Sequence, residues 1–333
     1  MEIMTGKPEF KDENFEQVIR NTINKPTGEI TSGDLAKIEK IEGWSEGIGD
    51  ISGLEHCVNL ESLMIWRSGI SDIRPLKNLT KLKSIGIECN PVSDIGPLGE
   101  LTNLTNLTLV GNQIGDIGPL KNLTNLELLD LHTNKITDIS PLENLTKLKG
   151  LHLGGQQIGD IAALSHLENL EGLTMNRCQI EDIGPLGELT SLTYLELIGN
   201  NIKDIAPLGK LRSLEGLLVS RNRIEDISPL GELTNLKQLG LSGNRISDTA
   251  PLGKLTKLVS LHIDICESHT GLDFLGGMTE MKQLFIKQRG LTDITILSVL
   301  PNLVDLRLME TSVTDLSPVS HVKTVLVIDK DGC

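Results

Sequence analysis

Three side chains in the middle of the sequence could do acid–base or metal chemistry together: Asp130, His132 and His152. Carboxylate and imidazole groups serve as general acids and bases, and both are ligands for metal ions. This set is therefore the best candidate in the chain for a hydrolase centre or a metal site. No Ser or Cys nucleophile accompanies it, and an open surface would not exclude water. We therefore interpret it as polar binding surface and expect no catalytic residue, no bound metal and no cofactor.

The elements that position these residues come from a repeat of 22 residues. The stretch from Leu104 to Asn125 reads LTNLTLVGNQIGDIGPLKNLTN, and its pattern is L-x-x-L-x-L-x-x-N-x-I-x-D-I-x-P-L-x-x-L-x-x. A fixed period of this length indicates a solenoid. Full repeats begin at Leu60, Leu82, Leu104, Leu126, Leu148, Leu170, Leu192, Leu214, Leu236, Leu258, Met281 and Leu303.

Each part of the repeat predicts one structural element. The L-x-L segment alternates apolar and outward positions and predicts a short strand, and identical repeats stack such strands in parallel. The Asn of the repeat should satisfy backbone groups at the turn after the strand. The Pro-Leu segment predicts a short helical turn, because Pro suits the first helical position. The fold class is therefore an α/β solenoid, a curved right-handed horseshoe with one parallel sheet on the concave side and short helical turns on the convex side.

The chain divides into three regions. Residues 1–47 are expected to form a helical cap, with one helix after Asp12 and a second after Thr31 that includes Leu35, Ile38 and Ile41. Trp44 should help to seal this cap. Residues 48–324 hold a half-repeat and twelve repeats, and residues 325–333 supply a capping strand and tail. The unit between positions 265 and 279 is irregular and should depart from the regular turn.

Composition limits the class of partner. The net charge of −14 argues against nucleic acid, whose affinity for proteins comes mainly from Lys and Arg. Part of the acidity is structural, because an Asp recurs at one position in eleven of the twelve repeats and should hydrogen-bond the turn backbone. No apolar run is long enough to span a membrane, and we expect a monomer. The segment MEIMTGKPEF lacks a hydrophobic signal core, which favours a cytoplasmic location, whereas a trimmed export signal would make the protein extracellular.

The repeat pattern N-L-T-x-L-x-L-x-x-N-x-I-x-D-I-x-P-L resembles that of the 22-residue class of leucine-rich repeat proteins, and of bacterial internalin-type proteins in particular. The resemblance covers about residues 48–328, and the helical segment before it is similar to the caps of such proteins. The resemblance implies recognition of a protein or surface ligand by the concave sheet.

The outward strand positions are where a partner would bind, since the fold requires no large apolar group there. Tyr194 lies close to Leu128, Ile198 and Leu218 in this reading, and Arg177 joins other arginines along the edge that follows the strands. The residues that we expect to contact a partner are Trp66, Leu128, Asp130, His132, His152, Tyr194, Glu196, Ile198, Leu218, Arg221, Arg223, Arg245 and Phe285.

The sequence thus predicts a non-enzymatic module that binds a macromolecular partner, a protein of unknown identity, on its concave sheet. An exported, internalin-like surface adhesin is the alternative within the binding class. A hydrolase or metal site at Asp130, His132 and His152 is the alternative in a different class.

Overall fold

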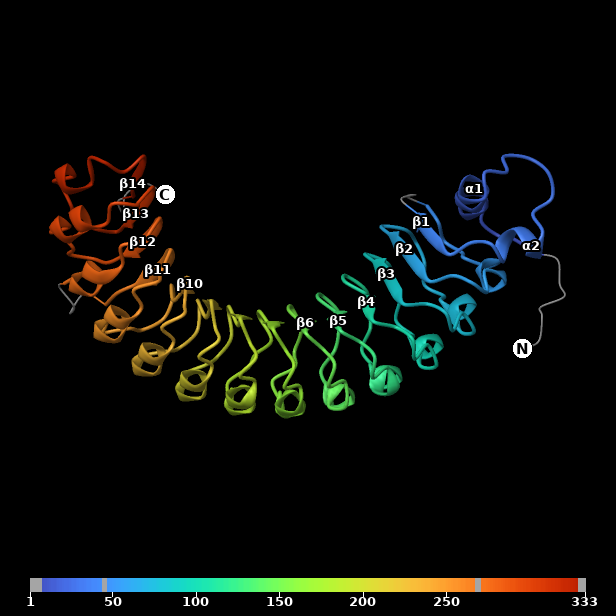
Figure 1. Cartoon of the computed structure of the whole chain (residues 1–333), viewed down its shortest axis with the longest axis horizontal. Coiled ribbons are helices and arrows are strands. Elements are labelled where there is room, and N and C mark those ends of the chain that lie inside the picture. Colours follow the sequence, from blue (N-terminus) through green and yellow to red (C-terminus); the bar gives the residue numbers. More distant parts are fainter. Residues whose placement is uncertain (1–7, 44–46, 267–270, 329–333) are drawn as a thin grey trace. The chain divides into compact units, whose positions relative to one another are not determined.

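The computed structural model describes residues 8–43, 47–266 and 271–328, so Trp44 and most of the irregular turn lie outside the described residues. The chain forms two compact units, Met1–Leu170 and Glu171–Cys333. Within each unit, short parallel strands stand side by side along one face and helical turns line the other (Figure 1). Among the described residues, no helix is both long and apolar enough to cross a bilayer.

The first unit begins with the two helices expected for the cap, α1 (Glu13–Thr22) and α2 (Ser32–Leu35). The Asp12 carboxylate caps α1 by accepting from the Phe15 amide at 3.0 Å, and it also accepts from the Gly49 amide at 2.7 Å. One side chain therefore ties the cap to the first half-repeat. Burial raises the pKa of Asp12, but these backbone hydrogen bonds outweigh burial and lower it overall.

The second cap helix is shorter than the sequence predicts. Thr31 and Asp34 form the expected capping box, but α2 ends after one turn. Ile41 lies in a strand, β1 (Lys40–Gly43), which pairs with β2 (Ser62–Trp66). Ile38 and Ile41 are three residues apart, a spacing that fits a helix, yet pairing with β2 decides the conformation. The sheet thus starts inside the region assigned to the helical cap.

The remaining strands follow the repeat. Register pairs residues 22 apart, as in Asp130 with His152, except for a step of 23 between Ser260 and Gln283 and a step of 19 between Asp305 and Thr324. In the first unit the further strands are β3 (Ser84–Glu88), β4 (Asn106–Thr108), β5 (Leu128–Asp130) and β6 (Gly150–His152). In the second unit they are β7 (Gly172–Thr174), β8 (Tyr194–Glu196), β9 (Gly216–Leu218), β10 (Gln238–Gly240), β11 (Ser260–Asp264), β12 (Gln283–Lys287), β13 (Asp305–Met309) and β14 (Thr324–Ile328).

The helical turns are 3-10 helices, most of them opened by the Pro of the repeat. In the first unit they are η1 (Leu54–His56), η2 (Arg74–Leu76), η3 (Gly96–Leu98), η4 (Gly118–Asn122), η5 (Ser140–Leu142) and η6 (Ala162–His166). In the second unit they are η7 (Gly184–Glu188), η8 (Ala206–Lys210), η9 (Ser228–Glu232), η10 (Ala250–Lys254), η11 (Asp273–Gly277), η12 (Thr295–Val299) and η13 (Ser317–Val319).

Strand and turn enclose a core of Leu and Ile layers. In one repeat, Leu104, Leu107, Leu109, Ile114 and Ile117 are each at most 1% exposed. The parallel-stranded leucine-rich repeat fold predicted from the sequence is confirmed within each unit.

The last strand, β14, pairs in parallel with β13 and extends the sheet of the second unit. Its own side chains are less buried than those of the inner repeats, since Leu326 is 44% exposed and Leu316, in the preceding turn, is 40% exposed. Apolar side chains thus meet solvent in the described part of this end.

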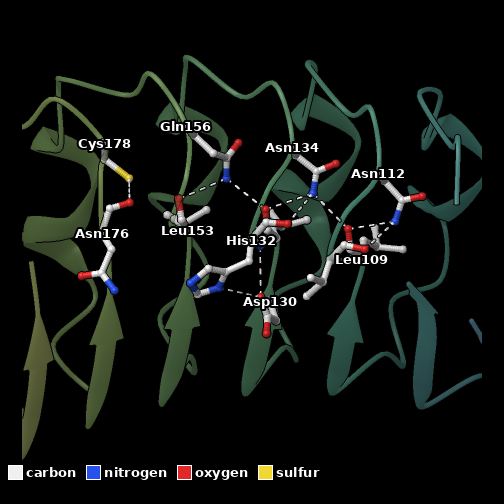
Figure 2. A network of polar contacts seen from close by, with 11 residues as sticks. Leu109, Asn112, Asp130, His132, Asn134, Leu153, Gln156, Asn176 and Cys178 are labelled. Carbon is white, nitrogen blue, oxygen red and sulfur yellow. Dashed lines mark hydrogen bonds and ion pairs between the residues drawn. The ribbon is translucent and has the colours of Figure 1, made fainter. Parts of the chain in front are cut away.

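A ladder of side-chain amides closes the turn after most strands, and Cys178 takes the amide position after β7 (Figure 2). The Asn134 amide donates to the Leu109 and Leu131 carbonyls at 2.9 Å each, and its carbonyl accepts from the Ile114 amide at 3.0 Å. One side chain therefore satisfies backbone groups of two successive repeats. Gln156 takes the same role in the following repeat. The predicted Asn ladder is confirmed.

Two further ladders hold the turns. The Asp of each repeat accepts from the amide two residues later, as Asp116 does from Gly118 at 2.7 Å, which confirms its predicted structural role. A second set of Asn residues was not anticipated from the sequence. Asn103 and Asn125 donate across the stack to the carbonyls of Thr80 and Thr102, each at 2.8 Å.

The amide ladder can be tested with two neighbouring substitutions. Asn134→Ala should lower the free energy of unfolding by roughly 1–3 kcal/mol, because buried carbonyl and amide groups lose their partner. Gln113→Ala should change it by less than about 0.5 kcal/mol, because the Gln113 side chain is exposed. Chemical denaturation measures both, and equal losses would contradict the assigned register.

The Asp ladder predicts a pH dependence of stability. Backbone and then hydroxyl hydrogen bonds from Ser140 and Ser228 lower the pKa of Asp138 and Asp226 in the folded state. Such groups add stability that is present above the unfolded pKa of about 4 and is lost as pH falls through the folded pKa. The melting temperature should therefore decrease on acidification below pH ~4. Asp138→Asn with Asp226→Asn, which keep the acceptor but do not titrate, should make that decrease shallower, and an unchanged slope would contradict this assignment.

Candidate functional site

Strand register places the predicted outward positions in continuous rows within each unit. Asp130 lies opposite His152 in the first unit, and Glu196 lies opposite Leu218 in the second. These rows form the outward face of each sheet, which we call the strand face. Each candidate residue on it is half-buried, so its side chain lies along the sheet with one side open to solvent.

In the first unit the structure brings Asp130, His132 and His152 together. Oδ1 of Asp130 accepts from the His132 amide at 3.1 Å and lies 3.0 Å from Nδ1 of the same residue. The rings of His132 and His152 are 5.9 Å apart, centre to centre. Figure 2 shows Asp130 and His132 on the strand side of the amide ladder.

These contacts give Asp130 a local structural role. Its carboxylate accepts from the backbone N–H of His132, which has no partner in the strand ladder. The same carboxylate orients the imidazole ring of His132. In the part of the chain that the structure describes, no cluster of three or more His, Cys, Asp or Glu residues could hold a metal ion.

Large side chains of the strand face lean over a glycine of the next repeat. In the first unit, a methyl carbon of Leu128 would lie 2.7 Å from a Cβ at Gly150. In the second unit, Cδ2 of Tyr194 would lie 2.6 Å from a Cβ at Gly216. Contacts shorter than about 3 Å are not tolerated between carbon atoms, so these glycines make room for the side chains. In particular, the edge of the Tyr194 ring lies over the backbone of β9 at Gly216.

Leu218 repeats this arrangement one strand further, where Cδ2 would lie 2.9 Å from a Cβ at Gly240. Leu128 belongs to the first unit, whereas Tyr194, Ile198 and Leu218 all belong to the second. The apolar group of the second unit therefore consists of these last three residues, which we call the Tyr194 patch.

Hydrogen bonds fix the polar end of the Tyr194 patch. The Tyr194 hydroxyl donates to Oε2 of Glu196 at 3.4 Å, and the Asn176 amide donates to Oε1 at 2.8 Å. Oδ1 of Asn176 accepts in turn from the Ile198 amide at 2.7 Å. Burial raises the pKa of the Tyr194 hydroxyl, and the charge and hydrogen bond of Glu196 raise it further.

The second unit also carries a hollow that the sequence analysis did not identify. It measures about 150 Å³, and its lining includes His262, Phe285, Asp305 and Arg307. The rings of His262 and Phe285 are 5.6 Å apart, and Arg307 pairs with Asp305 at 3.0 Å. Burial lowers the pKa of His262, the Arg307 charge adds to this effect, and Asp305 opposes it. The signal was available, because His262, Phe285 and Arg307 follow one another in the same outward row.

The remaining predicted residues lie apart from these groups. Trp66 ends β2 in the first unit and is half-buried. Arg221, Arg223 and Arg245 are exposed along the turn edge of the second unit, which follows the strands. Arg223 and Arg245 line a hollow of about 350 Å³ there.

Comparison with known proteins gives a consistent result. The family described as "Leucine Rich repeats (2 copies)" matches residues 102–144 and 190–232. An internalin (InlF) from Listeria monocytogenes is 34% identical, with 97% of this chain and 96% of that chain covered and a TM-score of 0.92. Internalin C2 from the same organism is 32% identical, covering 70% of this chain and 94% of its own, with a TM-score of 0.56.

A plant peptide hormone receptor, solved in complex with RGF2, shares the fold at 16% identity and a TM-score of 0.59, with 91% of this chain and 65% of the receptor covered. The search of curated proteins gives no match.

The contact between Tyr194 and Glu196 predicts a measurable titration, because the chain has 1 Tyr. Glu196→Gln should lower the pKa of Tyr194 toward its ordinary value of about 10 while leaving it above that value, since burial remains. Ultraviolet absorbance of tyrosinate during alkaline titration measures this. Glu232→Gln, on the turn side of the same unit, should leave the Tyr194 pKa unchanged. Equal curves for the Glu196 variant and the unaltered protein would disprove the contact.

Proposed function

Because the chain belongs to the internalin family of leucine-rich repeat proteins, we propose that it binds a protein partner through the strand face of its second unit, centred on the Tyr194 patch. The observation that carries this proposal is the position of Tyr194. Its ring lies on the strand face of β8, where the fold needs no large side chain, and Gly216 makes room for it.

The chemistry of the Tyr194 patch suits a protein surface. Tyr offers a large contact area and a hydrogen-bonding tip while losing little side-chain entropy, which is why it recurs at interface hot spots. The bond to Glu196 restrains the ring before a partner arrives, which lowers the entropic cost of binding. Ile198 and Leu218 add apolar area on the same and the next repeat.

The hollow beside Phe285 would extend this interface. It lies on β11 to β13 of the same unit and could receive one small side chain of the partner. The aromatic pair of His262 and Phe285 supplies a stacking wall, and Arg307 supplies a guanidinium group at the rim.

The likeness to the plant receptor, at 16% identity, bears on the fold alone. The choice of a protein ligand over nucleic acid rests on the net charge of −14. The proposal includes no catalytic step.

Removal of the Tyr194 ring should weaken binding more than it weakens the fold. Tyr194→Ala should cost at least about 2 kcal/mol of partner affinity, the usual threshold for a hot spot. The loss of stability should be on the order of 1 kcal/mol, because the half-buried ring also covers Gly216. A partner captured from the native host by the immobilised chain would be titrated against both proteins in a calorimeter.

The matched control is Arg212→Ala, an exposed residue in the segment between η8 and β9. It should leave partner affinity within about 0.5 kcal/mol. A larger loss for Arg212→Ala than for Tyr194→Ala would mean that the partner does not bind the strand face.

A further inference from the structure

The turn edge of the second unit carries a group of arginines that the Tyr194 patch does not use. We propose that this group, the arginine edge of Arg177, Arg221, Arg223 and Arg245, is a separate binding site for an extended acidic peptide segment. The site differs from the Tyr194 patch in its residues and in its ligand chemistry, and it can be tested independently.

The backbone conformation at the arginine edge is the first observation. Arg177 and Arg221 have φ of 55° and 57°, in the left-handed region that favours glycine. Glycine occupies the same position in the alternate repeats, at Gly199 and Gly243, with φ of 73° and 74°. The fold therefore accepts glycine here, and the chain keeps arginine despite its less favourable backbone conformation.

The glycines also leave space for the arginine side chains to extend along the edge onto the next repeat. Cγ of Arg177 would lie 3.2 Å from a Cβ at Gly199, and Cγ of Arg221 would lie 3.2 Å from a Cβ at Gly243. Each arginine stem thus rests on the next repeat, and its exposed side chain carries the charge into solvent. At the same position the first unit has Arg67, Cys89, Gly111, Thr133 and Gly155, so arginine occurs there once, whereas in the second unit arginine and glycine alternate.

Three of the four arginines of the arginine edge have no ion-pair partner in the described part of the chain. Among the described residues, no carboxylate lies within ion-pair distance of Arg177, Arg221 or Arg223, and Arg245 has only Glu225 at 3.7 Å. Lysines on the opposite edge, before the strands, behave differently. Lys237 pairs with Glu215 of the preceding repeat at 2.8 Å, and Lys83 and Lys149 pair in the same way. Free guanidinium groups on a chain of net charge −14 favour a carboxylate ligand.

A hollow beside these arginines offers room for a peptide. It measures about 350 Å³, and Lys203, Arg223 and Arg245 contribute to its lining. Two acidic residues of its lining, Asp204 and Asp226, are engaged in their own turns, since each accepts from a backbone amide at 2.8 Å. The third acidic residue of the lining, Glu225, lies 3.7 Å from Arg245, and Lys203 lies 3.6 Å from Glu181, so Arg223 is the cation of this lining that has no ion pair among the described residues.

The spacing of the arginines selects the shape of the ligand. Arg177 and Arg221 are two repeats apart, which corresponds to about 10 Å at ~4.8 Å for each strand. A polyproline II segment presents every third side chain on the same side, at intervals of about 9.3 Å. An acidic segment in this conformation, with a carboxylate at every third residue, would place successive carboxylates on the two arginines.

The test uses a fluorescently labelled peptide of repeated Glu-Pro-Pro triplets and measures its anisotropy at low ionic strength. Arg177→Gly combined with Arg221→Gly should weaken binding by roughly tenfold or more, since two charge-assisted contacts are lost. Because glycine suits the backbone at both positions, the melting temperature should stay the same or rise, so the loss cannot be attributed to unfolding.

The control has the same change in charge. Arg212→Gln combined with Lys257→Gln removes two cations elsewhere in the second unit and should change the dissociation constant by no more than about twofold. Tyr194→Ala should leave peptide binding unchanged, which separates this site from the proposed strand-face function. A triplet peptide with Gln in place of Glu should not bind.

Four results would overturn the proposal. The first is no binding of the Glu-Pro-Pro peptide by the unaltered protein. The second is an equal loss in both double variants, and the third is equal binding of the Gln peptide. The fourth is tighter binding of a heparin fragment or a single-stranded oligonucleotide than of the acidic peptide, which would assign the arginine edge to another class of ligand.

Discussion

The structure depends on one constraint, the need to satisfy backbone groups where the chain leaves each strand. A side-chain amide does this in two repeats at once, as Asn134 shows with its bonds to Leu109, Leu131 and Ile114. Because buried backbone groups are costly to leave unpaired, the amide must recur at a fixed spacing. Gln156 can replace Asn since it offers the same donor and acceptor. The 22-residue period is thus a consequence of hydrogen bonding as much as of Leu packing.

This constraint divides the sequence into positions that the fold determines and positions that it leaves free. Leu, Ile, Asn and the Asp of each turn belong to the first group. The Asp residues also account for part of the negative charge, since residues such as Asp116 serve their own turns. Residues that recognise a partner must therefore be among the positions that the fold leaves free, which lie on the strand face and on the turn edges.

The fold could be predicted from the sequence because the repeats share one pattern. A wrong assignment of strand or turn in one repeat is therefore exposed by comparison with the other repeats. The cap has no such redundancy. The spacing of Ile38 and Ile41 fits a helix, but pairing of β1 with β2 settled the conformation at Ile41. The candidate site was only partly readable. Rows of residues follow from register, but the lean of Tyr194 over Gly216 and the hollow at His262 and Phe285 depend on side-chain direction, which the pattern does not contain.

Residues that depart from the repeat fall into two groups: those explained by contacts within the chain and those that no such contact explains. In the sequence, Asp130 and His132 were candidates for acid–base or metal chemistry. In the structure, the Asp130 carboxylate contacts the backbone amide and the ring of His132. Tyr194 is only partly accounted for, since Glu196 and Gly216 explain how its ring is accommodated but not why a Tyr is there. Arg177 and Arg221 are not accounted for at all: glycine would suit their backbone better, and no described carboxylate pairs with them. A residue that persists against the local preference of the fold points to an interaction outside the chain, and both proposed surfaces rest on that reasoning.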